Sequence, residues 1–445
     1  MKGDTKRKSG YEFPLVLLMG SVVAVLSMLI FAPVPASAAS ISADSSTIFR
    51  MMESPEDKKL YPLFEYLRLS GTSDVGEYGS IAVNMGGWGR VDLGDKSFDD
   101  SQTGGDLQYG YLSYRGTKNN LLFNAGRQFV AEGVVAERLD GLYLRGDVAA
   151  GFSAAAFVGS PVVITQPGFK GGDIIYGGRI VQSNPKYYSI GLSALRTDYS
   201  GSAIREEEGI DIWLHPLKMI DIVGKSSYNS ITSNWMNHDY SIAFNPHEKL
   251  RITGFGSYIR YQDYFYQVTT PALALANAGG QIDPNEKVLT LGGSVEFLPV
   301  KSLRLTADYK NHDYDIAGRA QFYGGKATFS LPDSFVAGFS AHRMDGETDK
   351  LRYDQYRVFA QKKWGKADLT VDFFNLNYQS PINGVKNTYS VSGAVAYAIT
   401  ENLNVAADVN YLKDTIYDNA VTGFIKVNYT FDKKLGAEGG KKSEK

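Results

Sequence analysis

The sequence predicts an all-β protein: an up-and-down antiparallel β-barrel of about 20 strands, with 18 to 22 acceptable, that crosses a membrane. Three observations predict it. Segment after segment alternates between apolar and polar residues with a period of two, which is the period of a strand. Short and long connections alternate between these segments. Beyond the N-terminal region, no apolar run approaches the length of a transmembrane helix, so a membrane must be crossed with strands.

The alternation gives each expected strand one apolar and one polar face. In residues 402–411, Leu403, Val405 and Val409 share one face, and Asn404 and Asp408 share the other. The apolar faces mix Gly, Ala, Leu and Val with Tyr or Phe toward the strand ends. A soluble core favours large residues throughout, whereas a lipid-facing band flanked by aromatic girdles has this mixture. We therefore expect the apolar faces to contact outer-membrane lipid.

The polar faces carry too many charges for a dry interior, so we expect them to line an aqueous lumen. Acids and bases are interspersed, which predicts neither anion nor cation preference. The residues expected to line the lumen are Lys225, Glu296, Arg304, Asp308, Lys310, Lys326, Asp368, Asp372, Asp408 and Lys426.

The connections divide into two classes that alternate along the chain. Short links are expected at residues such as 116–119, 215–218 and 298–301. Longer polar or Gly-rich links include residues 94–105, 130–139, 161–172, 198–207, 268–286 and 379–387. A transmembrane barrel with short periplasmic turns and longer external loops has this asymmetry, and a soluble Greek key has no reason for it.

The chain divides into four expected parts. Residues 1–38 are predicted to be a signal peptide, because a basic start precedes an apolar stretch and the small residues Ala36-Ser37-Ala38. Residues 39–77 do not alternate clearly and are expected to form a periplasmic or lumen-inserted lead-in with a short helix, or else a disordered leader. The barrel is expected over 78–431, and a polar periplasmic tail over 432–445. Export and a closed barrel together predict the bacterial outer membrane.

Composition excludes several classes of function. The chain has no Cys, so it holds no disulfide, no thiolate metal site and no thioether-linked haem. Its formal net charge of −2, without a large basic block, makes nucleic acid an unexpected partner. The five histidines fall on separate segments without metal-ligand spacing, and no nucleophile motif is present. We predict no catalytic, cofactor-binding or metal-binding residue, and no enzyme.

Four short motifs carry a resemblance to a known family. They are residues 87–93 (GWGRVDL), 106–112 (DLQYGYL), 126–129 (GRQF) and 137–142 (ERLDGL). Over about residues 60–200 the chain resembles the porin-like barrels of outer-membrane porin–cytochrome conduits in metal-reducing bacteria. The resemblance implies a sheath in which periplasmic and extracellular multihaem c-type cytochromes meet. Haem would then belong to the partners alone, because this chain has no CxxCH motif.

Two other functions compete with the conduit. One is a diffusion or substrate-selective porin for small solutes, whose lumen is narrowed by an infolded loop such as residues 268–286. This loop contains an unusually apolar run from Pro271 to Ala276. The other is a barrel enzyme, which ranks last because adjacent Ser, His and Asp residues on one strand do not make a catalytic triad.

Overall fold

The computed structural model describes residues 39–53, 58–97, 101–162, 173–265, 283, 285–332, 334–416 and 419–435. Its strands are β1 (Ala39–Glu53), β2 (Lys59–Leu60), β3 (Pro62–Asp74), β4 (Ser80–Asp92), β5 (Thr103–Arg115), β6 (Leu121–Glu132), β7 (Val135–Asp147), β8 (Phe152–Pro161), β9 (Ile174–Asn184), β10 (Tyr188–Tyr199), β11 (Ser202–Leu217), β12 (Ile220–Asn229), β13 (Asn234–His247), β14 (Leu250–Arg260), β15 (Lys287–Val300), β16 (Leu303–Tyr314), β17 (Gly318–Leu331), β18 (Phe335–Gly346), β19 (Tyr353–Trp364), β20 (Ala367–Ile382), β21 (Val385–Ala398), β22 (Leu403–Lys413) and β23 (Ala420–Leu435). The described helices are the short α2 (Tyr261–Tyr264) and three 3-10 turns.

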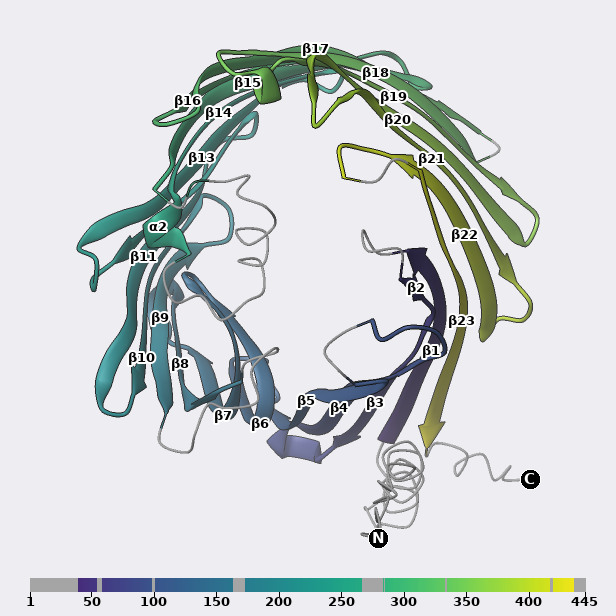
Figure 1. Cartoon of the computed structure of the whole chain (residues 1–445). Helices are drawn as coiled ribbons and strands as arrows, with labels where there is room; N and C mark the ends of the chain where they lie inside the picture. The colour runs from purple at the N-terminus through teal and green to yellow at the C-terminus, as the bar shows by residue number, and fades with distance from the viewer. Residues whose placement is uncertain are drawn as a thin grey trace, which may run out of the picture.

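The strands form one closed barrel (Figure 1). Apart from β2, each strand pairs antiparallel with the next one along the chain, so β1 pairs with β3, and the pairing of β1 with β23 closes the ring. The wall has 22 strands, and β2 is an extra two-residue strand that pairs with the end of β1. An even number of antiparallel strands is the rule for bacterial single-chain barrels. The predicted fold class and strand range are confirmed.

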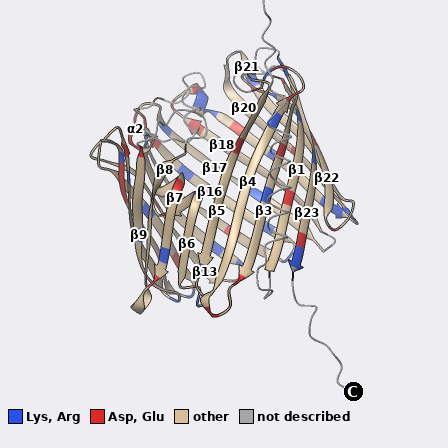
Figure 2. Cartoon of the chain, turned by 90° about the horizontal axis from the view of Figure 1, so that it is seen from below, with Lys and Arg blue, Asp and Glu red and all other residues tan. Residues whose placement is uncertain are grey.

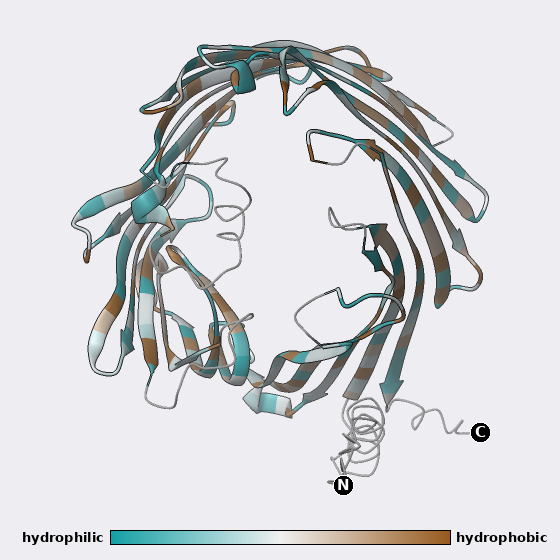
Figure 3. Ribbon diagram, in the orientation of Figure 1, coloured by the Kyte–Doolittle hydropathy of each residue, from teal (hydrophilic) through white to brown (hydrophobic). Residues whose placement is uncertain are grey.

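The outer surface of this ring is apolar. Large apolar side chains are exposed on alternate positions of neighbouring strands, such as Leu305 (39% exposed), Val409 (54%) and Ile425 (48%). Ribbon colours alternate between apolar and polar along the strands (Figure 3), and basic and acidic residues are interspersed along them (Figure 2). Soluble monomers rarely expose so much continuous apolar surface, whereas a barrel presents it to lipid. Among the described residues, no helix is long and apolar enough to span a membrane.

The connections lie at two unequal rims. Ala39 and Leu435 are cross-strand partners, so both ends of the described chain lie at one rim. Every turn at this rim is short: the shortest include residues 218–219 and the longest include residues 75–79. The opposite rim carries the longer connections, including 93–102, 162–173 and 261–286. Three connections predicted to be long are instead tight turns there, at 133–134, 200–201 and 383–384. At 200–201 and 383–384 the strands stay paired up to the turn, although the residues there are mostly polar and do not alternate, so the sequence pattern placed loops at these positions.

The prediction of a lead-in and short helix over residues 39–77 is wrong. Ala39–Glu53 and Pro62–Asp74 are β1 and β3, and both belong to the wall. The outer face of β1 carries Ser45 and Thr47, whose hydroxyls donate to the Glu65 carboxylate on β3 at 2.6 and 2.5 Å. These polar residues on the outer face hide the alternation, so the sequence pattern missed both strands.

The two predicted terminal parts fall mostly outside the described residues. This holds for the signal peptide at 1–38 and for residues 436–445 of the tail. The last strand continues to Leu435, four positions past the predicted end of the barrel at 431. The apolar run from Pro271 to Ala276 also lies outside the described part of the chain.

Candidate functional site: a hairpin folded into the lumen

The hairpin of β6 and β7 leaves the wall half-way along its length. β6 pairs with β5 only from Leu122 to Arg127, and β7 pairs with β8 only from Leu139 onward. Beyond these points the two strands still pair with each other, up to the turn at 133–134. Residues 128–138 are named here the inner hairpin. They have no strand pairing with β5 or β8, and at their base the backbone N–H of Val162 donates to the Arg138 backbone oxygen at 2.8 Å.

A glycine marks the position where β6 departs from β5. Gly126 has a φ of +126°, and a Cβ built on it would lie 2.3 Å from the backbone oxygen of Gly110 on β5. Only glycine takes this backbone conformation without strain and allows so close an approach. Gly126 therefore permits the bend that sends the inner hairpin away from β5.

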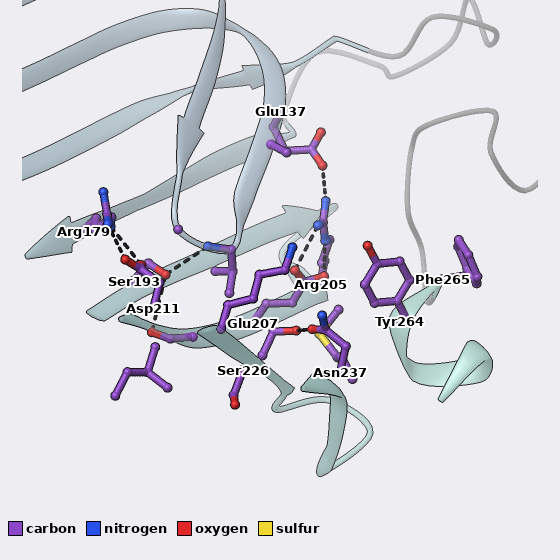
Figure 4. A pocket seen from close by; sticks show the side chains of 18 residues that line it. Glu137, Arg179, Ser193, Arg205, Glu207, Asp211, Ser226, Asn237, Tyr264 and Phe265 are labelled. Atoms are coloured by element: carbon purple, nitrogen blue, oxygen red, sulfur yellow. Dashed lines mark hydrogen bonds and ion pairs between the residues drawn. The ribbon is translucent and has the colours of Figure 1, made fainter. Parts of the chain in front are cut away.

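The tip of the inner hairpin lies against β10 and β11 (Figure 4). The backbone N–H of Val134 donates to Ser193 Oγ on β10 at 3.0 Å. A Cβ built on Gly209 of β11 would lie 2.1 Å from Val134 Cγ1, so the tip and the wall are in close contact. Since β8 and β9 separate β7 from β10 in the wall, the inner hairpin must cross the inner faces of both. It lies inside the lumen.

An apolar core lies between the inner hairpin and the wall. Val130, Val135 and Leu139 of the hairpin strands are 2%, 1% and 0% exposed, and pack with inward side chains of β8, β9 and β10. Those wall residues include Phe157 and Leu195. Burying an aliphatic side chain fully stabilises by about 1.5–3 kcal/mol. This cluster supplies an apolar driving force that holds the hairpin inside an otherwise polar lumen.

Buried ion pairs join the tip of the inner hairpin to the wall. Arg205 of β11 lies between two carboxylates, Glu137 from the hairpin and Glu207 from its own strand. The three side chains are 8%, 6% and 2% exposed. Buried charges require partners, and here one guanidinium serves two acids. The arrangement fixes Glu137, and with it the hairpin, at one position on β11.

A second network lies beside the first. Glu132 of the hairpin accepts a hydrogen bond from the Tyr143 hydroxyl at 2.6 Å and pairs with Arg179 of β9 at 3.4 Å. Arg179 also forms a bidentate ion pair with Asp211 of β11. At the base of the hairpin, Arg138 pairs with Asp106 of β5 at 2.7 Å. The inner hairpin is thus tied to the wall on both sides.

Between the hairpin tip, β9 to β13 and α2 lies a cavity of about 470 Å³. Ligand pockets in proteins commonly measure about 300–1,000 Å³. Its lining combines the charged residues above with Lys225, Met236, Tyr264 and Phe265. Apolar surface with a few convergent polar groups is the usual make-up of a binding site. We take the inner hairpin and this cavity as the candidate functional site.

The short helix α2, which supplies Tyr264 and is followed by Phe265, is fixed to the rim. The Glu286 carbonyl accepts from the backbone N–H of Tyr261 at 3.1 Å. The Glu286 carboxylate accepts from the backbone N–H groups of Ile316 and Ala317 at 2.9 and 3.0 Å. Burial raises the pKa of the Tyr261 hydroxyl, and the Glu286 charge adds to the effect. α2 is therefore held in place beside the cavity.

The ten predicted lumen residues lie on β12, β15, β16, β17, β20, β22 and β23. Only Lys225 lines the cavity at the inner hairpin; Lys426 lines a second one, of about 520 Å³, on β1, β3, β22 and β23. Within the described chain, the one ion pair between members of the set joins Glu296 and Arg304 at 3.6 Å.

The other predicted residues are placed as follows. Asp308 pairs with His342 at 3.0 Å, Asp372 pairs with Arg357 at 2.5 Å, Lys310 lies over Phe255 and Phe322, Lys326 lies over Phe359, Asp368 lies opposite Lys363, and Asp408 lies opposite Ala394. A role for any of them in solute passage stays a prediction. In the part of the chain that is described, no group of three His, Asp or Glu side chains is placed to hold a metal ion.

Sequence reasoning missed the charged residues of the site. Arg205, Glu137 and Glu207 stand in segments that were assigned to loops, and Arg179 lies in an expected strand but was not singled out. One signal was available: charges spaced two apart, as in Arg205 and Glu207, share one face of a strand. The contact between that face and a hairpin four strands away has no local signature.

The closed ring, its apolar outer surface and its two unequal rims define a multi-pass β-barrel of the bacterial outer membrane. No family profile matches the sequence, and no curated protein matches it at a significant level. Solved outer-membrane barrels do resemble the structure. A mutant of the ferric enterobactin receptor PfeA from Pseudomonas aeruginosa is 10% identical, with 88% of this chain and 80% of the receptor covered and a TM-score of 0.54.

Two further solved structures are less similar in shape. OccK8 (OprE) from Pseudomonas aeruginosa is 9% identical over 88% of this chain and 98% of its own, with a TM-score of 0.45. OccAB4 from Acinetobacter baumannii is 12% identical over 90% of this chain and 100% of its own, with a TM-score of 0.44. At these identities the likeness to the receptor establishes a shared barrel fold alone.

Proposed function

We propose that this porin-like barrel is a porin for small solutes, whose lumen is narrowed by the inner hairpin. The observation that carries the proposal is the docking of residues 128–138 across the inner faces of β8 and β9 onto β10 and β11. A barrel of about 22 strands encloses a lumen too wide for selection unless something fills or narrows it. The inner hairpin narrows it, and the fixed charges around the hairpin supply polar contacts for a passing solute.

The sequence led us to expect residues 268–286 as the narrowing loop. Residues 268–282 lie outside the described part of the chain. The element that supports the proposal is instead the connection at 130–139, which was expected to be an external loop. The porin hypothesis is kept, with a different segment as its constriction.

The test is conductance of the purified mature protein in planar bilayers. We expect stable open channels, and a larger conductance when residues 130–137 are replaced by an Asn-Gly turn. Such a turn suits a two-residue hairpin, so β6 and β7 can still pair. Heat-modifiable migration in gels checks that the variant still forms a barrel. Equal conductance of the two folded proteins would contradict the role given to the inner hairpin.

The conduit hypothesis remains the second candidate, because a 22-strand circumference also leaves room for a folded partner. It predicts a different outcome of the same purification. Haem absorbance that co-elutes with the barrel after mild detergent extraction, together with no conductance of the isolated barrel, would favour the sheath over the porin.

A further inference from the structure

Among the described residues that line the cavity at the tip of the inner hairpin, one accessible charge has no ion-pair partner. Among its lining residues, Glu137 and Glu207 are held by Arg205, and Asp211 is held by Arg179. Lys225 is exposed and makes no ion pair or hydrogen bond with any described residue. Two acids lie opposite Lys225 on the neighbouring strands. Asp211 on β11 lines the cavity and is paired with Arg179, and Asp239 on β13 does not line it; neither forms an ion pair with Lys225 in the described chain.

The remaining polar groups of the cavity are mostly satisfied within the protein. Ser193 accepts from the backbone N–H of Val134, and Ser227 donates to Asn237. Ser226 bonds to groups on β13. Of the lining side chains, the Lys225 ammonium and the Tyr264 hydroxyl have no partner among the described residues. Both can donate, so the open hydrogen-bonding capacity of the cavity favours an acceptor.

Burial decides between an anionic and a cationic ligand. A cation would need a free carboxylate, but the Glu207 and Glu137 side chains are 2% and 6% exposed and are already bound to Arg205. Asp211 is engaged by two nitrogens of Arg179. Asp211 and Arg179 are partly exposed, at 28% and 21%, but they are bound to each other. Lys225 is the accessible charge of the described lining that is not already paired, so an anion that pairs with it leaves the existing ion pairs intact.

The rest of the lining favours an apolar portion on the same ligand. Met236 and the aromatic residues Tyr264 and Phe265 contribute apolar surface. Aromatic rings and a polarizable Met side chain pack well against flat apolar groups. We propose that this cavity is a binding site for a small organic anion with one negative charge and an apolar, preferably aromatic, portion. The negative charge pairs with Lys225, and the apolar portion lies against Tyr264 and Phe265.

This inference rests on the proposed porin function for its physiological meaning, but binding is measurable without transport. The probes are 3-phenylpropionate, the neutral 3-phenylpropanol and the cationic 3-phenylpropylamine, which share a skeleton and differ in charge. Propionate tests the need for the ring. Binding to the detergent-solubilised full mature protein is measured by saturation-transfer NMR and calorimetry, and current blockade is recorded in parallel.

We expect 3-phenylpropionate to bind more tightly than the alcohol and the amine, and propionate to bind more weakly than 3-phenylpropionate. Lys225→Gln should weaken 3-phenylpropionate binding about 10- to 100-fold, the range for losing one charge-assisted hydrogen bond. The matched control is Lys426→Gln, which removes an equal charge from the second cavity and should leave affinity unchanged. Equal affinity of acid and alcohol, or equal loss in both variants, would overturn the site. Binding without any channel current would keep the site and reject the porin.

Discussion

Arg205→Met is the most informative perturbation of the inner hairpin. Methionine keeps much of the side-chain length but removes the cation between Glu137 and Glu207, whose side chains are only 6% and 2% exposed. Removing one partner of a buried ion pair costs about 3–5 kcal/mol, because the remaining charge is left unpaired in a poor solvent. Here two carboxylates of like charge are left. Since one belongs to the hairpin and the other to the wall, undocking of the hairpin separates and hydrates them.

The expected size of the effect follows from this cost. At about 1.4 kcal/mol for each factor of ten, 3–5 kcal/mol lowers the ratio of docked to undocked hairpin roughly 100- to 5,000-fold. Hydrogen exchange measured by mass spectrometry should show faster exchange over residues 130–137, with β15 to β18 unchanged. Single-channel conductance should rise toward that of the protein without the inner hairpin.

The control is Arg319→Met on β17, away from the hairpin. Arg319 lies 3.5 Å from Asp313, and the two side chains are 74% and 48% exposed. Exposed pairs contribute about 0–1 kcal/mol, so this variant should conduct, and exchange over residues 130–137, nearly as the wild type does. If Arg205→Met left exchange over 130–137 unchanged, or if Arg319→Met had the larger effect there, the ion pairs of Arg205 with Glu137 and Glu207 would not be what holds the hairpin.

Three further predictions test the fold and the placement of the hairpin. The double variant Val134→Cys, Gly209→Cys should form a disulfide on oxidation, because a Cβ on Gly209 would lie 2.1 Å from Val134 Cγ1. The chain has no other cysteine, so mass spectrometry can assign the bond, and free thiols after oxidation would refute the docked position. Gly126→Val should abolish heat-modifiable migration, since its φ is +126° and its Cβ would lie 2.3 Å from a backbone oxygen; a normally folded variant would contradict this. Val409→Arg on the outer face should destabilise the barrel by about 2–4 kcal/mol in urea unfolding from vesicles, whereas Asn410→Arg on the inner face should not; equal losses would reverse the assigned faces.

The sequence predicted the wall well because the wall repeats a simple physical rule. Each lipid-facing strand must be apolar on one side and polar on the other, so Leu303, Val405 and Val409 reveal their strands without knowledge of their neighbours. The rule fails where side chains on the outer face are polar. On β1 the outward Ser45 and Thr47 satisfy the Glu65 carboxylate, and the strand was therefore taken for a lead-in segment.

The inner hairpin could not be predicted for a different reason. Val130 and Val135 are apolar because they pack on wall strands far away in sequence, and Glu137 is tolerated because Arg205 lies opposite it in space. Local patterning contains no information on either contact. The same holds for the cavity, where Lys225 was expected in the lumen but Tyr264 and Phe265 were not connected with it.

Folding the hairpin inward also leaves part of the wall without strand pairing, which costs free energy. Over Thr103–Tyr109 the edge of β5 has no partner on the β6 side in the described chain. A backbone hydrogen bond contributes about 0.5–1.5 kcal/mol net, so the lost ladder amounts to a few kcal/mol. Two arginines offset part of it, since Arg127 donates to the Leu107 backbone oxygen at 3.1 Å and Arg138 pairs with Asp106. The remaining cost of the unpaired β5 edge must be offset by the apolar cluster under the hairpin and by the ion pairs of Arg205 with Glu137 and Glu207. Undocking and resealing of the β5 edge are therefore one coupled equilibrium, and Arg205→Met should slow hydrogen exchange along that edge while it accelerates exchange in the hairpin.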